Sequence, residues 1–599
     1  MIPQLPLRDF GLQNIPAVPY LLTFSEPLLT LFRLARRALE VQPAKDGLSN
    51  RYTIGAQTGT AYEFLFGSSA AQDLARATND LEEILVKGFE GVRDAALRRS
   101  VSASRVSSAT QGPLWTGLSL EKPEDFSISW TNFENIYQNA QSLLPGWANT
   151  LASLDEADQR FWPTIANYGI AYNLIVLQLV TSAKAAALKP LFGDMWSFGG
   201  LDTMQSEGRL YAIDLSIFGE FGPVTVDGWT RFTPATITLL EQNAATKALK
   251  PLAVHVANGS QSQLYSRTRT PDAWLYALQA AKASLTVYGI WLGHVYHWHI
   301  VTAALQMTMF NTLSADHPIL QLASSQSNYL IAFNEVLLLL WDYIAPPTSI
   351  ATPFQFLELC DGFANGRRFF DDDPKSALAQ LGLEQAAFTR NEPWDLYPLV
   401  RNLLRIWDST QTFVDIFVEK TYSDDQAVDL DTQLQAWMTA SADPNQGNIR
   451  GLPAMNTKAA LKAVLASFLY RMTAHGISRL NNSANPALTF IANFPPCLQK
   501  SDLPTAQADL DVKSLLGYLP KTGTIGKMVT FYFTFVFSVP YTSFIPPTGV
   551  ESDLFFPSGL GDPRNVALVA RRKDLISFIE NVYQPEQPQI YQWPMCIET

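Results

Sequence analysis

Three of the chain's six histidines fall within one short segment, His294-Val-Tyr-His-Trp-His299. The segment lies inside a long apolar run, from Thr286 to Phe310, that contains no proline and no charged residue. Neutral imidazole nitrogens are good ligands for iron and other transition metals, whereas a buried histidine without a metal is a hydrogen-bonded core group. The segment is therefore a candidate metal site. Any further ligand has to be a carboxylate or one of the remaining histidines, which are His255, His317 and His475.

The spacing of these histidines leaves two pairings open. On an ideal α-helix His294 and His297 lie about 60° apart around the axis, which suits a shared ligand. His294 and His299 lie about 140° apart, and they share a face only if the helix contains a wider π-type turn. Ideal helix geometry therefore favours His294 with His297.

The elements that position this segment are mainly helices. After Asp272 the pattern is helical almost to the end of the chain, with loops at 346–353, 371–374 and 443–453. A buried helix is expected near 171–188. Short β-branched or aromatic runs bounded by Gly, Pro and Asn predict a small antiparallel sheet at 210–218, 232–240 and 252–256. The expected fold class is mainly α with this sheet appended. We expect residues 1–125 to form a helical or irregular extension packed on the core, and residues 126–599 to form one large domain.

Composition excludes several function classes. The chain is 47% hydrophobic and only 16% charged, so we expect a large interior. A net charge of −12 disfavours nucleic acid as a partner, because nucleic-acid binding needs clustered Lys and Arg. The apolar stretches at 528–540 and 170–180 are shorter than the roughly 20 residues that a transmembrane helix needs. The N-terminus lacks a signal-peptide pattern, and three widely spaced cysteines predict a reducing, cytoplasmic location. Nothing in the sequence specifies an oligomeric state.

Several stretches, in a common order, resemble the lipoxygenase family. That family has a helix with two iron-binding histidines separated by four residues, and a His-Pro-Ile element eighteen residues after the second. Here His299 and His317 are eighteen residues apart. Further stretches resemble the family's LQAW, PNAPC and MGSLP segments and its C-terminal tail; they are Leu434–Trp437, Ala492–Cys497, Leu515–Pro520 and Ile590–Pro594. The resemblance covers roughly residues 130–599, and it implies a lipoxygenase-like helical catalytic domain without the N-terminal β-barrel of animal and plant members.

The resemblance implies a ligand set that differs from the ideal-helix pairing. It selects His294 and His299, and it places the third ligand on a later helix, where His475 fits. It leaves His297 as an additional histidine. His255, on an expected strand, is interpreted as a core group, and His317, before a proline, as a helix-boundary residue.

The remaining two ligands of the family are altered here. Four residues after the third histidine, where the family has Asn, His or Ser, this chain has Arg479, and a guanidinium cannot ligate a metal. Asn482 is the best substitute, because seven residues return to nearly the same helical face. The family's last ligand is a terminal main-chain carboxylate. Either Thr599 supplies it by a shorter route, or this ligand is absent and the centre has three histidines with open positions. A second departure is Ala303, where lipoxygenases usually carry Glu.

The resemblance implies a non-heme iron dioxygenase, with manganese as an alternative metal. In the family a ferric hydroxide abstracts a hydrogen atom from a polyunsaturated fatty acid or a similar lipophilic polyene, and O2 then adds to the radical. Arg479, Ala303 and the altered tail motivate an alternative, in which the same fold performs another oxidation of a lipophilic metabolite. A third hypothesis is a lipid-binding relative that has lost catalysis.

Overall fold

The computed structural model of the chain describes most of residues 154–519 and 558–582, and its longer gaps are 169–173, 327–347 and 485–494. The expected N-terminal extension at 1–125, and its boundary with the following domain, lie outside the described residues. Within them the structure is mainly helical and contains an antiparallel sheet, which confirms the expected fold class.

The larger sheet has five antiparallel strands in the order β1-β2-β5-β6-β7. The three predicted strands are confirmed as the centre of this sheet. Its strands are β1 (Leu177–Leu179), β2 (Leu210–Leu215), β5 (Ala235–Gln242), β6 (Leu249–Asn258) and β7 (Gln261–Ser266). A separate two-stranded sheet pairs β3 (Val224–Val226) with β4 (Trp229–Arg231).

The helix expected near 171–188 is wrong at 174–181, whereas 171–173 lie outside the described residues. Leu177–Leu179 form edge strand β1, which pairs with β2 and whose Leu179 N–H donates to the Leu381 carbonyl at 2.8 Å. The helix α8 (Ser182–Phe192) begins only after Thr181, whose side chain accepts a hydrogen bond from the Lys184 N–H. A short apolar run is compatible with either a buried strand or a buried helix, so pattern alone did not separate them.

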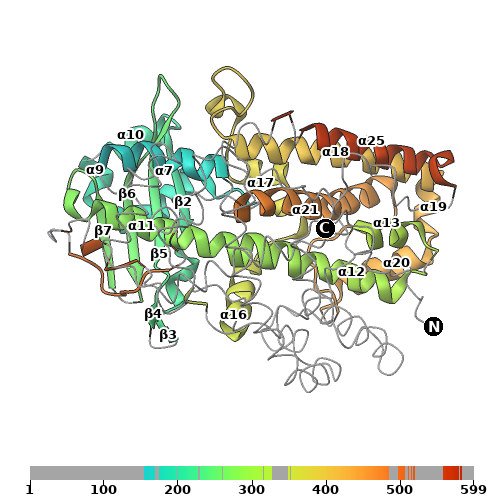
Figure 1. Cartoon of the computed structure of the whole chain (residues 1–599), viewed down its shortest axis with the longest axis horizontal. Helices are drawn as coiled ribbons and strands as arrows, with labels where there is room; N and C mark the ends of the chain where they lie inside the picture. The colour runs from blue at the N-terminus through green and yellow to red at the C-terminus, as the bar shows by residue number, and fades with distance from the viewer. Residues whose placement is uncertain are drawn as a thin grey trace, which may run out of the picture.

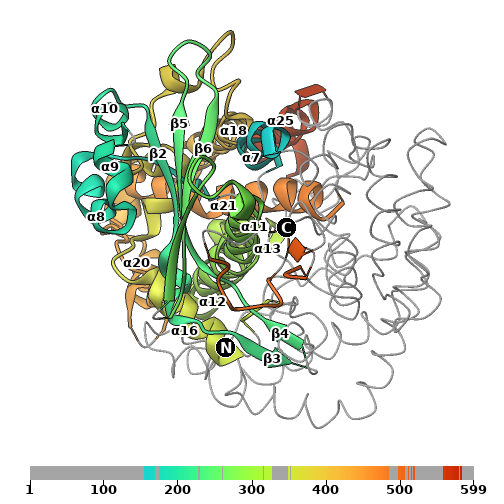
Figure 2. The same ribbon diagram turned by 90° about the vertical axis from the view of Figure 1, so that its left-hand side faces the viewer.

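Helices cover both faces of the sheet (Figure 2). One face packs against α8, α9 (Asp194–Phe198) and α10 (Leu201–Ser206), and the other packs against α7 (Leu154–Tyr168) and α11 (Pro271–Tyr288). The period of two along β2 divides its side chains between these layers: Leu210 and Ala212 belong to the first, whereas Tyr211 and Ile213 belong to the second.

One long helical path connects the sheet to the helical part of the molecule (Figure 1). It consists of α11, the π-helix η6 (Gly289–Ile300) and α12 (Val301–Thr312). Pro271 at the first helical position suits a helix start, because proline has no N–H that would need a partner there. Asp272 in the first turn complements the positive end of the helix dipole. The path is anchored on the sheet by the Ser284 hydroxyl, which donates to the Pro234 carbonyl at 2.6 Å just before β5.

The helical part is organised around α21 (Lys458–Ala484). This helix packs against η6, α12, α13 (Pro318–Gln326) and α18 (Pro398–Thr421), and α18 in turn packs against α25 (Pro563–Phe578). The helix α20 (Thr432–Ala442) packs on α12. The connecting segment before α18 contains α16 (Pro353–Ala364), the 3-10 helix η7 (Phe369–Asp372) and α17 (Pro374–Gln380). Among the described helices, none combines the length and the apolar character that a membrane span requires.

Candidate metal centre

The histidine segment folds as a π-helix. In η6 the characteristic hydrogen bonds link residues five apart, so a residue and the fifth one after it lie nearly above one another. His294 and His299 therefore share a face in the backbone register, and His297 lies elsewhere around the axis. The α-helical geometry that favoured pairing His294 with His297 is not the geometry of this segment, and the identity of the metal ligands stays a prediction. The register implied by the family resemblance agrees with the structure.

His294 is held in a dry, aromatic environment. Its side chain is fully buried, and its ring centroid lies 6.0 Å from that of Trp298. Neighbouring apolar side chains of the same π-helix are also buried, among them Trp291, Leu292 and Val295. A hydrophobic shell of this kind limits the access of solvent to a metal site.

The third candidate ligand lies on the helix that packs against η6. His475 belongs to α21, and α21 contacts η6 directly. Arg479 and Asn482 follow on the same helix, one and two turns after His475. The side chains of His299, His475, Arg479 and Asn482 are not among those described, and Thr599 lies outside the described residues. The structure thus brings together the two helices that carry His294, His299 and His475.

His297 faces a charged segment that the sequence reasoning did not include. Its Nε2 lies 3.9 Å from Oδ2 of Asp372 in η7, and the side chain is fully buried. Burial, together with the nearby guanidinium groups of Arg471 and Arg367, lowers the pKa of His297 well below its ordinary value, so the imidazole is neutral. His297 therefore belongs to the contact between η6 and η7.

Arg471 connects this segment to α21, four residues before His475. Its guanidinium donates to the Phe369 carbonyl and to the Ser467 hydroxyl, and it stacks over the Phe369 ring at 4.3 Å. Its Nη1 also lies 3.6 Å from Asp373 Oδ1. The sequence signal that points to these residues is a run of two arginines and three aspartates, interrupted by two phenylalanines, in a chain with few charges. The sequence pattern predicts a loop at 371–374, whereas the structure has the end of η7 and the start of α17 there.

Asp373 is an acid held in an apolar interior. Burial raises its pKa to about 7, although the charge of Arg471 and the Ser467 hydroxyl, 2.5 Å away, act in the opposite direction. The Asp373 carboxyl, which lies between η7 and α21, therefore changes charge near neutral pH.

The other two histidines have the structural roles expected from the sequence. His317 directly precedes α13, and its Nε2 lies 3.1 Å from Asp431 Oδ2. His255 lies on β6, partly buried, with its ring 6.3 Å from that of Phe192. Burial lowers the pKa of His255. Neither residue lies on η6 or α21.

The arrangement fits a transition metal bound by imidazoles. Such a centre requires three imidazoles that can converge. The structure provides a fully buried histidine, a π-turn that aligns a second one, and a packed neighbouring helix that carries a third. Among the side chains that the structure describes, which do not include those of His299 and His475, no three His, Cys, Asp or Glu gather as a metal site.

Comparison with known proteins points to one family. The family model for lipoxygenases matches residues 393–520. Over 298 residues the chain is 26% identical to lipoxygenase 4, chloroplastic, of Arabidopsis thaliana, covering 46% of this chain and 31% of that protein. Over 336 residues it is 26% identical to the manganese lipoxygenase of Colletotrichum gloeosporioides, covering 53% of this chain and 52% of the relative. The chain thus matches a third to a half of the length of these relatives.

Solved structures share the fold. A calcium-dependent 11R-lipoxygenase superposes with a TM-score of 0.60 at 17% identity, over 84% of this chain and 72% of the other. The manganese lipoxygenase of Gaeumannomyces graminis superposes with a TM-score of 0.58 at 18% identity, over 84% of this chain and 87% of the other. At these identities the likeness establishes a common fold.

Proposed function

We propose, since the chain belongs to the lipoxygenase family, that it is a metal-dependent dioxygenase that inserts O2 into a polyunsaturated fatty acid or a similar lipophilic polyene. The observation that carries this proposal is the π-helix η6, which puts His294 and His299 on one face in the register that the family's two helical ligands require. The contact between η6 and α21, the helix of His475, supports it further.

In this proposal His294, His299 and His475 hold the metal, with Asn482 and the Thr599 carboxylate as candidates for the remaining positions. Iron or manganese, when bound, supplies a one-electron oxidant that starts the reaction by removing a hydrogen atom from the methylene between two cis double bonds. The protein positions that methylene and excludes water. The buried apolar side chains of η6, including Trp291 and Leu292, keep the interior next to His294 dry.

Arg479 supports a second candidate function. It occupies the helix position one turn after His475, where the family places a fourth ligand, and an arginine there remains cationic. A cation at the family's fourth-ligand position favours a substrate with an acidic group, and so an oxidation of a specialised lipophilic metabolite by the same fold. The two candidates differ in their product, which is a simple hydroperoxide only for the first.

The test combines O2 uptake with absorbance of a conjugated diene. The protein, loaded with iron or with manganese, is supplied with a panel of polyunsaturated fatty acids, and products are identified by mass spectrometry. We expect O2 consumption, a rising diene signal and a hydroperoxide, all lost in His294→Ala. A metal-loaded protein that consumes no O2 across the panel would refute the first function. A product other than a hydroperoxide would favour the second.

A further inference from the structure

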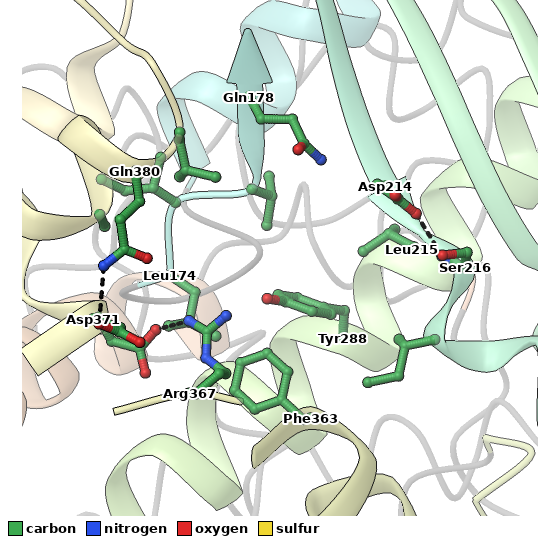
Figure 3. A pocket seen from close by; sticks show the side chains of 16 residues that line it. Leu174, Gln178, Asp214, Leu215, Ser216, Tyr288, Phe363, Arg367, Asp371 and Gln380 are labelled. Carbon is green, nitrogen blue, oxygen red and sulfur yellow. Dashed lines mark hydrogen bonds and ion pairs between the residues drawn. The ribbon is translucent and has the colours of Figure 1, made fainter. Parts of the chain in front are cut away.

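A polar pocket of about 320 Å³ lies between the sheet and the segment that contains η7 (Figure 3). Its walls come from β1, the end of β2, the last residue of α11, η7 and α17. The pocket contains none of the candidate metal ligands. Its volume is at the lower end of the range of small-molecule sites, but its lining is more polar than that of most such sites. A polyene would therefore leave many polar groups unsatisfied there.

The polar side chains that face the pocket have unused hydrogen-bond donors. The Tyr288 hydroxyl points into the space, and the Gln178 amide lies on the opposite side (Figure 3). No hydrogen bond joins either group to any of the described residues. Burial raises the pKa of Tyr288 above its ordinary range, so the hydroxyl remains a donor.

Arg367 adds a third donor group. Its guanidinium lies over the Phe363 ring at 4.3 Å and donates through Nη2 to Asp372 Oδ1. Its Nε finds no acceptor among the described residues. A guanidinium has five N–H donors in a fixed plane, so one carboxylate contact leaves most of them available. A ligand for this pocket must therefore bring acceptor oxygens.

The charges around the pocket exclude an anion as that ligand. Asp372 is paired with Arg367, and Asp214 is paired with Lys184. Asp371 lacks a cationic partner among the described residues: it accepts hydrogen bonds from the Arg368 N–H at 2.8 Å and from Gln380 Nε2 at 2.9 Å. The lining is thus acidic overall, and a carboxylate or phosphate placed beside Asp371 would be repelled.

We propose that this pocket binds a neutral, oxygen-rich molecule, a polyol such as a free sugar or the hydroxylated head group of a glyceride. Hydroxyl oxygens accept from Tyr288, Gln178 and Arg367. The hydroxyl hydrogens of the same ligand donate to the Asp371 carboxylate and the Gln380 carbonyl oxygen. Apolar residues of the wall, among them Ile175 and Leu215, pack against its carbon skeleton.

The test measures binding by saturation-transfer NMR and equilibrium dialysis on the full chain, without added metal. The probes are myo-inositol and glucose as free polyols, a short-chain monoacylglycerol as the head-group source, and benzoate and phenethylammonium as charged probes. The variants are Tyr288→Phe and Gln178→Leu, each of which removes donors without adding charge. The matched control is Tyr296→Phe, because Tyr296 packs edge-on against the same Phe363 ring but does not line the pocket.

We expect a neutral polyol to bind and each pocket variant to weaken that binding by about 3- to 10-fold, the effect of one lost hydrogen bond, while Tyr296→Phe leaves it unchanged. Binding of the free polyols identifies the source as a soluble sugar, and binding of the monoacylglycerol alone identifies it as a glyceride. The proposal is overturned if no neutral probe binds, if a charged probe binds more tightly than all of them, or if Tyr288→Phe and Tyr296→Phe act alike. Because no metal is needed, these outcomes are independent of dioxygenase activity.

Discussion

At the residue scale, Asp431 is the centre of a small polar network that explains His317. Its Oδ2 accepts from the Tyr422 hydroxyl at 2.7 Å and lies 3.1 Å from His317 Nε2, while its Oδ1 caps α20 by accepting from the Leu434 N–H at 3.0 Å. We expect Asp431→Ala to lower the free energy of unfolding by about 2 kcal/mol, the combined effect of a lost cap and lost hydrogen bonds. Urea denaturation measures this. Asp424→Ala removes the exposed cap of α19 (Asp425–Asp429) and an exposed hydrogen bond from Ser423, so it should cost less. Equal losses would contradict the network.

The same network gives a pH dependence with a definite sign. Burial acts to raise the pKa of Asp431, but the hydrogen bonds from Tyr422, the Leu434 N–H and His317 outweigh it, so the pKa is lowered. A depressed carboxyl pKa stabilises the folded state above the pKa of the unfolded chain, and that contribution is lost as the pH falls through the folded pKa. The stability difference between the wild type and Asp431→Asn should therefore shrink in acid below about pH 4.

The contribution of Asp373 to the pH dependence of stability should have the opposite sign. Because burial raises its pKa to about 7, the folded state favours the protonated acid, and stability is lost as the pH rises from about 4 through 7. We expect Asp373→Asn, which cannot ionise, to become more stable relative to the wild type as the pH increases from 5 to 8.5. Ser467→Ala removes a hydrogen bond that lowers this pKa, so it should move the transition to higher pH. A stability difference that does not change with pH would show that Asp373 stays charged.

At the scale of the element, the π-helix register predicts a different set of metal-binding histidines from the one that an α-helix would predict. If η6 keeps its register, His299→Ala and His294→Ala remove ligands, whereas His297→Ala removes a neighbour of Asp372. We expect the first two variants to lose at least about ten-fold in metal affinity and His297→Ala to keep its metal content. Elemental analysis of freshly purified proteins, combined with circular dichroism to confirm folding, measures this. Loss of metal in His297→Ala but not in His299→Ala would restore the ideal-helix pairing.

Trp437, in the LQAW stretch, links α20 to the helix that continues from η6. It is fully buried, and its indole N–H donates to the Leu305 carbonyl in α12 at 3.1 Å. Trp437→Phe keeps most of the packing but loses this bond and some volume, so we expect a loss of about 1–3 kcal/mol in the free energy of unfolding. Met438→Leu, at a buried position on the same helix, is the control and should cost less. A smaller loss for the tryptophan variant would contradict this role.

At the scale of the whole molecule, the sequence predicts the helical body and the central strands, because periodicity and flanking Gly and Pro are local signals. The register of η6 required the family resemblance, since no local pattern distinguishes a π-turn from an α-turn in a run of apolar residues. Edge strand β1 could not be predicted from Leu177–Leu179 alone, because its pairing partner β2 lies some thirty residues later. The pocket beside Tyr288 depends on contacts between segments about 190 residues apart, from β1 to η7.

The proposed metal would join two parts of the molecule that pack against each other. One ligand pair lies on the path from α11 through η6 to α12, and the third lies on α21. A ligand that binds only the folded state stabilises it by RT ln(1 + [L]/Kd), about 2.7 kcal/mol at a hundredfold excess over Kd. Removing the metal with a chelator should therefore lower the unfolding temperature by a few degrees, as measured by scanning calorimetry. His475→Ala should unfold at the same temperature with and without chelator. An equal chelator effect in wild type and His475→Ala would mean that the stabilising ion binds elsewhere.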